Sequence, residues 1–189
     1  IRRLSTADGE SLYLRLSTRP TDQTPFAQAR ERAGDATIRA HVLAGGYRLI
    51  EPDPALHDAP RVLIASCGAV LPEAVHAARM LATEGVAATV LDLTSPDRLY
   101  REWRGELRDA GLAARPARID DIHLATLITH DERRAPIITV HDAASHALAW
   151  LGSVFGQRVV PVGVDAFGQS GSIIDLYDLF DLMPEQLTN

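Results

Sequence analysis

Short, continuously apolar segments alternate with amphipathic segments over most of the chain, starting at residue 61. Strands are expected at 61–66, 87–93, 136–140 and 158–164. Helices are expected between and after them, at 71–83, 97–110, 143–155 and 172–182. Apolar strands separated by helices form parallel βαβ units, with both faces of the sheet covered. The pattern therefore predicts a doubly wound α/β domain built on a parallel sheet.

Local signals mark the ends of these helices. Gly85 follows the first helix at a position where glycine often ends a helix. Ser95 and Pro96 start the second helix, because Ser is a good cap and Pro is favoured at the first helical position. The segment 111–134 has the weakest pattern, and one short helix near 121–129 is expected there.

The first sixty residues are organised differently. Residues 11–17 alternate apolar and polar side chains, which predicts a strand with one buried face. Residues 26–34 suit a short polar helix, and a double glycine at 45–46 turns an apolar segment into a strand at 47–51. Because the chain starts at Ile1 and its first residues do not resemble the start of a domain, we expect a piece of a longer polypeptide.

Composition limits the functional classes. The 189 residues carry a formal net charge of −6, which argues against a surface for nucleic acid or another polyanion. The single cysteine, Cys67, excludes an internal disulfide framework and fits a reducing cytoplasm. No apolar run is long enough to span a bilayer, and no signal peptide is visible. We therefore expect a cytoplasmic protein that binds neither nucleic acid nor a membrane.

A glycine-bracketed turn follows the last predicted strand. Gly163, Gly168 and Gly171 lie near this strand-to-helix junction, but their spacing does not match the G-x-G-x-x-G fingerprint of dinucleotide-binding folds. We interpret the segment as a structural turn with a Ser cap, either Ser170 or Ser172, on the last helix. The abrupt reversal predicts a positive φ at Gly168 or Gly171.

Polar side chains gather at the end of the third parallel strand. His141, Asp142 and His146 lie at the edge where doubly wound folds place ligands, but their spacing matches no zinc signature. A metal site is one interpretation. In the other, Asp142 caps the next helix through Ser145, and both histidines line an interface. Cys67 follows a strand, but a nucleophilic thiol needs a base, and a buried, inert thiol is the alternative.

The last two predicted helices carry more large apolar side chains than one small domain is expected to bury: Trp150, Leu151, Phe155, Tyr177 and Phe180. Large exposed apolar patches usually mark an interface. We therefore predict self-association, most simply as a twofold dimer, with Trp150, Leu151 and Phe155 in the interface. His141 and His146 are further interface candidates.

Several motifs, in this order, resemble one protein family. The segment 162–173, with its Phe167-Gly168-Gln169-Ser170 turn, resembles the last strand–helix unit of the transketolase C-terminal domain, in the version carried by homodimeric 2-oxo-acid dehydrogenases such as pyruvate dehydrogenase. Residues 64–74 resemble the family's small-residue turn and its Leu-x-Glu-Ala helix, and 90–100 resemble the next strand and Ser-rich helix start. Residues 13–20 look like the final strand of the preceding pyrimidine-binding domain, and 38–51 like the linker and first strand that follow it.

The resemblance implies a three-layer αβα fold on a five-stranded mixed sheet. Four strands would be parallel, and the strand at 47–51 would be the antiparallel edge strand. It also implies three parts of the chain. Residues 1–25 would be a remnant of the pyrimidine-binding domain, 26–60 a linker with the edge strand, and 61–189 the transketolase C-terminal-like domain.

For function, the resemblance implies an oxidoreductase that decarboxylates a 2-oxo acid, usually pyruvate, on thiamine diphosphate and magnesium. The acyl group would pass to the lipoyl carrier of an acyltransferase component. In this family other domains of the same polypeptide hold the cofactor, so we expect no catalytic, cofactor-binding or metal-binding residue here. The expected role is structural, in a homodimer. Two alternatives stay open: a transketolase domain, whose enzyme transfers ketol units between sugar phosphates, and a stand-alone module that binds a nucleotide or a protein.

Overall fold

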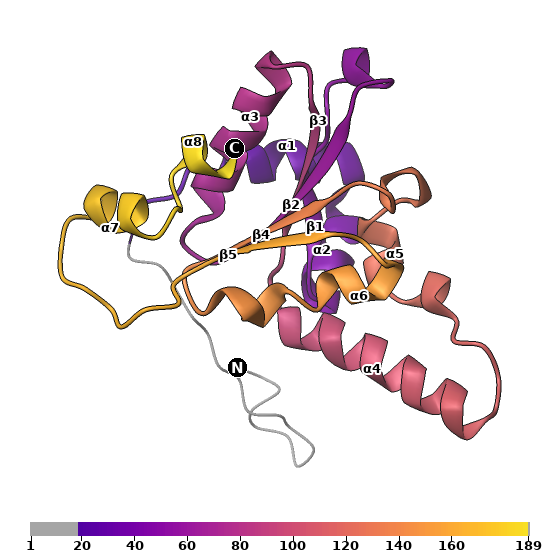
Figure 1. The fold of residues 1–189 in the computed structure, drawn as a ribbon. Coiled ribbons are helices and arrows are strands. Elements are labelled where there is room, and N and C mark those ends of the chain that lie inside the picture. The colour runs from indigo at the N-terminus through magenta and orange to yellow at the C-terminus, as the bar shows by residue number, and fades with distance from the viewer. Residues whose placement is uncertain (1–18, 189) are drawn as a thin grey trace, which may run out of the picture.

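A five-stranded mixed sheet forms the centre of the molecule. The computed structural model describes residues 19–188. In the order of the sheet, the strands are β1 (Tyr47–Ile50), β3 (Ala87–Asp92), β2 (Arg61–Cys67), β4 (Ile137–His141) and β5 (Val159–Val162). Strand β1 pairs antiparallel with β3 at one edge, and the other pairs are parallel (Figure 1). The predicted mixed sheet, with 47–51 as its antiparallel edge strand, is confirmed.

Helices cover both faces of this sheet. They are α1 (Thr24–Ala33), α2 (Asp35–Ala44), α3 (Leu71–Thr83), α4 (Pro96–Leu112), α5 (Leu124–Leu127), α6 (Leu151–Phe155), α7 (Ile173–Leu179) and α8 (Pro184–Leu187). The buried side chains of α1, α3 and α8 share one hydrophobic cluster, and those of α4, α5 and α6 share another on the opposite face (Figure 1). Among the helices within residues 19–188, none is both long and apolar enough to cross a bilayer.

Strand β2 shows why the parallel strands read as unbroken apolar runs. Val62 and Ile64 belong to the cluster beneath α3, whereas Leu63 and Ala65 belong to the cluster beneath α4. Successive side chains of a strand point to opposite faces, so a strand covered on both sides needs an apolar residue at every position.

The segment 143–155 does not form the single helix that its sequence predicts. A 3₁₀ turn at Ser145–Leu148 precedes the shorter helix α6, which ends at Gly156 in the left-handed conformation. The reason lies at the start of the segment. The carbonyl of Ala143 accepts a hydrogen bond from the Val164 amide at 2.9 Å, and Ala144 is extended. The carbonyl of Ala143 therefore binds the segment after β5 and does not accept the first hydrogen bond of a helix that starts at residue 143.

The short polar helix predicted at 26–34 is present as α1, and a second helix, α2, follows it before β1. Two other expectations need correction. The segment 111–134 contains α5 flanked by 3₁₀ turns at Ile119–Asp121 and His130–Glu132, not one longer helix. The last predicted helix stops at Leu179, because Asp181 adopts a left-handed conformation with φ 57°. The strand predicted at 11–17 lies outside the described residues.

A buried ion pair joins the antiparallel edge strand to the rest of the domain. Arg48 of β1 donates two hydrogen bonds to the carboxylate of Glu132, at 2.7 and 2.9 Å. Glu132 also accepts hydrogen bonds from the hydroxyl groups of Thr89 in β3 and of Thr129, at 2.6 and 2.7 Å. The side chain of Glu132 is only 3% exposed. The pair thus ties β1, β3 and the turn before β4 together.

The hydrogen bonds decide the ionisation of this carboxylate. Burial by itself would raise the pKa of Glu132. The hydrogen bonds from Arg48 and Thr89 act in the opposite direction and outweigh burial, so that the pKa falls to about 2. Glu132 is therefore ionised over the whole neutral and mildly acidic range.

Replacing Arg48 with Met should strongly destabilise the fold. The substitution keeps much of the apolar stem but leaves the Glu132 carboxylate buried without its cation, which typically costs about 3–5 kcal/mol. Urea unfolding of the parent chain and of Arg48→Met measures the difference. The matched control is Arg101→Met, which breaks an exposed pair with Asp97 on α4 and should have little effect.

The pH dependence of stability separates loss of this pair from loss of packing. The pKa of Glu132 lies below its ordinary value of 4.5 in the fold. Its contribution is therefore fully present above about pH 4.5 and is lost as the pH falls toward 2. The loss of stability over this window should be smaller in Arg48→Met. An equally steep acid dependence in that variant would contradict the assigned role of the pair.

Candidate functional site

The carboxyl ends of β2 and β4 meet at the point where the strand order reverses. The chain passes from β2 to β3 on one side, and β4 lies on the other side of β2. Open α/β sheets bind ligands at such a point. Cys67 and His141 are direct neighbours in the register of the two strands, so the sheet brings together a thiol and an imidazole that are far apart in sequence. The sequence analysis missed this pairing, because it needs the register of β2 against β4.

The geometry around this pair does not support a proton relay through Asp142. His141 Nε2 lies 3.9 Å from Asp142 Oδ1, which is longer than the roughly 2.6–3.2 Å that such a relay requires. In residues 19–188, no three His, Cys, Asp or Glu side chains are grouped to hold a metal ion. The metal interpretation of His141, Asp142 and His146 therefore has no support in the described geometry.

The predicted cap on Ser145 comes from a different carboxylate. Asp165, in the loop after β5, accepts hydrogen bonds from the Ser145 amide at 2.8 Å and from its hydroxyl group at 2.5 Å. These bonds lower the pKa of Asp165. The carboxylate of Asp142 instead lies over Gly68, where an added Cβ would be 3.0 Å from Asp142 Oδ1. The sequence prediction assigned this interaction to the wrong carboxylate, because the correct one, Asp165, lies 20 positions after Ser145.

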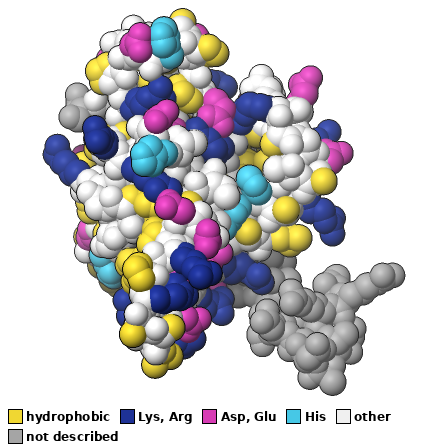
Figure 2. Space-filling model, turned by 90° about the vertical axis from the view of Figure 1, so that its right-hand side faces the viewer, with side chains coloured by type: hydrophobic (Ala, Val, Ile, Leu, Met, Phe, Trp, Pro, Cys, Tyr) yellow, Lys and Arg dark blue, Asp and Glu magenta, His cyan; other side chains and the backbone are white. Residues whose placement is uncertain are grey.

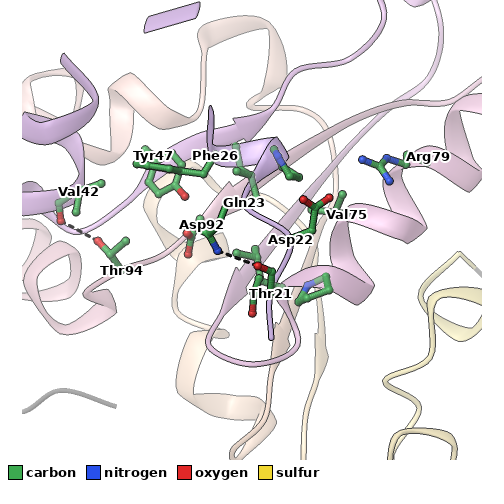
Figure 3. A pocket seen from close by; sticks show the side chains of 14 residues that line it. Thr21, Asp22, Gln23, Phe26, Val42, Tyr47, Val75, Arg79, Asp92 and Thr94 are labelled. Atoms are coloured by element: carbon green, nitrogen blue, oxygen red, sulfur yellow. Dashed lines mark hydrogen bonds between the residues drawn. The ribbon is translucent and has the colours of Figure 1, made fainter. Parts of the chain in front are cut away.

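A pocket of about 380 Å³ opens between α1, α3 and β1 (Figure 3). Its wall is mainly apolar, formed by Pro25, Phe26, Val42, Leu49, Leu71, Pro72 and Val75. The polar residues of the lining form two groups. Tyr47, Asp92 and Thr94 come from β1, the end of β3 and the loop after it, and the second group is Thr21, Asp22, Gln23 and Arg79. No sequence motif marked this pocket.

Tyr47 and Asp92 form the polar part of the pocket interior. They are cross-strand partners in the antiparallel pairing of β1 with β3, which places their side chains on the same face of the sheet. The Tyr47 hydroxyl group faces the Asp92 carboxyl group (Figure 3). Burial raises the pKa of Tyr47, and it also raises the pKa of Asp92 against the opposing effect of the nearby Tyr47 hydroxyl group. Asp92 is therefore a carboxyl group whose charge is poorly solvated.

Ser172 is the cap of α7 in the C-terminal turn. Its hydroxyl oxygen accepts a hydrogen bond from the Asp175 amide at 3.2 Å. Ser170 and Phe167 are exposed, and Phe167 keeps 91% of its surface accessible. The prediction of a positive φ at Gly168 or Gly171 is wrong, since neither glycine adopts one.

The glycine that this turn requires is Gly163, at the exit of β5. A Cβ at this position would lie 2.4 Å from the carbonyl oxygen of Ala143 and 2.8 Å from the backbone of Ser145. Gly163 is thus needed for close approach of two backbone segments, and not for an unusual φ angle. At Gly168, in contrast, a Cβ would meet nothing within 4 Å.

The proposed interface residues are distributed differently from the prediction. Leu151 is fully buried in the core, so the expectation that it offers surface to a partner is wrong. Trp150 stacks on Trp103 with ring centroids 5.7 Å apart, and Phe155 lies beneath the guanidinium of Arg133. His141 is mostly buried beside Cys67, whereas His146 is exposed.

The exposed large apolar side chains concentrate instead in the C-terminal segment. Phe167, Ile173, Ile174 and Leu179 all keep at least half of their surface accessible. We call these four residues the C-terminal apolar patch. On the face shown in Figure 2, Arg and acidic side chains are intermixed, without a broad area of positive charge.

Comparison with known proteins places this architecture in a family. A family model described as the transketolase-like TK C-terminal domain matches residues 45–183. A curated relative named "Transketolase, plasmid", from Cupriavidus necator, is 29% identical over 153 residues, which are 79% of this chain and 18% of the relative.

Solved structures agree with that match at the level of the fold. The transketolase from Leishmania mexicana covers 90% of this chain with 23% of its own length, at 20% identity and a TM-score of 0.54. The transketolase from Campylobacter jejuni covers 77% of this chain with 18% of its own length, at 20% identity and a TM-score of 0.50. The chain thus spans about a fifth of the length of these relatives.

The role assigned to Gly163 predicts a large difference between two equivalent substitutions. Gly163→Ala should destabilise the chain by about 1–3 kcal/mol, because the methyl group forces the 143–145 backbone away from β5. Gly168→Ala should change stability by no more than about 0.5 kcal/mol, since its site is open. Thermal unfolding of both variants tests this. Equal stabilities would contradict the close-approach explanation.

Proposed function

The chain belongs to the transketolase-like C-terminal domain family, and we propose that it is the C-terminal domain of a thiamine-diphosphate-dependent 2-oxo-acid dehydrogenase most like pyruvate dehydrogenase. The observation that carries the proposal is the family match over 45–183, which includes the whole sheet. The finer assignment rests on the motifs described above, above all the Phe167-Gly168-Gln169-Ser170 turn. It makes the parent enzyme an oxidoreductase that works on a 2-oxo acid.

The described residues do not fit the binding of the cofactor itself. Thiamine diphosphate and its divalent metal need oxygen ligands for the metal and donors for the diphosphate. Residues 19–188 contain no cluster of three His, Cys, Asp or Glu side chains for a metal. The Tyr47–Asp92 pocket offers a carboxyl group, which would repel a diphosphate. No catalytic step is therefore assigned to this chain, and the cofactor would be held by other domains of the same polypeptide.

The role proposed for this domain is to build part of a subunit interface. The C-terminal apolar patch supports this role, because several large apolar side chains exposed in one short segment are typical of a surface that is covered in an assembly. Its position in the C-terminal segment leaves the sheet and both core clusters intact. A homodimer and contact with the lipoyl acyltransferase component are further parts of the proposal.

One observation favours a second candidate, a transketolase that transfers ketol units between sugar phosphates. The curated relative at 29% identity is named a transketolase. A transketolase would be a transferase and would use no lipoyl partner. The two candidates share the fold and the cofactor, so only the reaction of the intact polypeptide distinguishes them.

The intact polypeptide that contains this chain should reduce ferricyanide in the presence of pyruvate, thiamine diphosphate and magnesium. It should also acylate an isolated lipoyl domain, and it should not transfer a two-carbon ketol unit from a ketose phosphate to an aldose phosphate. Ketol transfer without pyruvate oxidation would replace the proposal with the transketolase candidate. Absence of both activities in cofactor-loaded protein would favour a binding module.

The interface role predicts that charge in the C-terminal apolar patch weakens self-association. Ile174→Glu should raise the dissociation constant of the dimer by about tenfold or more, because a carboxylate would be buried in the interface. Analytical ultracentrifugation of the chain measures the change. The matched control is Leu112→Glu, at a residue that is 82% exposed at the end of α4. Equal effects of both substitutions, or none, would refute the assignment of the patch.

A further inference from the structure

We propose that the pocket over Tyr47 and Asp92 binds a small organic cation that carries an apolar ring. The pocket is independent of the proposed function, because it lies on the α1–α3 side of the sheet and needs no other domain to form its described walls. Its volume of about 380 Å³ lies in the lower part of the range for small-molecule sites, roughly 300–1,000 Å³. Such a volume suits a single ring compound and not a peptide.

The sheet edge builds the polar end of the pocket. Asp92 is the last residue of β3 and follows a buried run, so its carboxyl group is held at the carboxyl end of a parallel strand. Antiparallel β1 places Tyr47 directly opposite, and the hydroxyl of Tyr47 faces Asp92 (Figure 3). Nearby, the Thr94 hydroxyl donates to the carbonyl of Val42 at 2.8 Å, which fixes the rim between β3 and α2.

The charged residues of the pocket indicate whether its ligand is a cation or an anion. Among the residues described, no Arg or His side chain forms an ion pair with Asp92, in contrast to the buried Glu132 on the other face. Asp22 and Arg79 both line the pocket away from Asp92 and carry opposite charges, so Asp92 is the charged group that remains to be matched (Figure 3). A partly buried carboxylate without a cation is poorly solvated, and a cationic group that enters the pocket would stabilise it.

The apolar residues of the pocket wall indicate which ligand shape would fit. Phe26 and Tyr47 meet edge to face, with ring centroids 5.8 Å apart and an angle of 77° between their planes. Val42, Leu71 and Val75 line the remaining wall. A flat ring can pack against these side chains while its charged nitrogen reaches Asp92. This division, an apolar wall with a few convergent polar groups, is typical of small-molecule sites.

Titration with benzamidine tests the proposal, and benzamide serves as the neutral probe of the same shape. Benzamidine should bind the chain saturably with a dissociation constant of about 1 mM or less, and benzamide at least about tenfold more weakly. Binding should tighten as the pH rises through the raised pKa of Asp92, with release of a proton. Isothermal titration calorimetry in buffers of different ionisation enthalpy measures both quantities.

Two variants locate the site. Asp92→Asn keeps the size of the side chain and should weaken benzamidine binding at least about tenfold, whereas the matched variant Asp58→Asn, at an exposed carboxylate outside the pocket, should change it by less than about threefold. If Asp92→Asn does not fold, Val75→Phe narrows the pocket from α3 and should cause a similar loss. Equal affinities for benzamidine and benzamide, or unchanged binding in both Asp92→Asn and Val75→Phe, would overturn the proposal. So would the absence of saturable binding.

Discussion

A buried ion pair between Arg48 and Glu132 ties the antiparallel edge strand to the rest of the domain, and the core packing of Tyr47 and Leu49 supports the same strand. Strand β1 has only four residues, and it is held through Arg48 to Glu132 and, by backbone pairing, to β3. A short edge strand with few backbone contacts is marginal without side-chain support. Glu132 has its full set of partners in Arg48, Thr89 and Thr129, so the network carries no buried acceptor without a donor. The cost of burying the two charges is offset by this complete set of bonds.

The C-terminal segment, in contrast to β1, is held at few points and exposes apolar side chains. Strand β5 is the second edge of the sheet, and the chain that follows it is anchored at two points, by Val164 on Ala143 and by Asp165 on Ser145. Beyond those anchors, Phe167 and Ile174 project to the surface. Core and exposed patch are therefore separate parts of the same chain. A substitution in the patch can change association without changing the core, which is the arrangement that an interface segment needs.

The sequence is sufficient for the elements that rest on continuous apolar runs. Strands β2, β3, β4 and β5 lie within one or two residues of their predicted ranges, because each is a short run dominated by apolar residues, and β2, β3 and β4 are buried along most of their length. The prediction fails where a distant segment uses the same backbone groups. The 143–155 helix is broken because Val164 takes the carbonyl of Ala143, and the required glycine is Gly163 because that backbone approaches it. No local pattern contains this information.

The pocket is hidden from sequence for a related reason. Tyr47 and Asp92 are 45 positions apart, and only the antiparallel register of β1 against β3 sets them opposite each other. The same register puts Arg48, the next residue of β1, on the other face, where it pairs with Glu132. One strand thus supplies a cation to a buried carboxylate on one face and places a neutral hydroxyl group beside a partly buried carboxyl group on the other. The first carboxylate, Glu132, has hydrogen-bond donors on both oxygens and stabilises the fold. The second, Asp92, has no ion-pair partner within residues 19–188. Because the Arg48–Glu132 pair holds the strand that carries Tyr47, we expect the proposed affinity of the pocket for a cation to depend on an ion pair on the opposite face of the sheet.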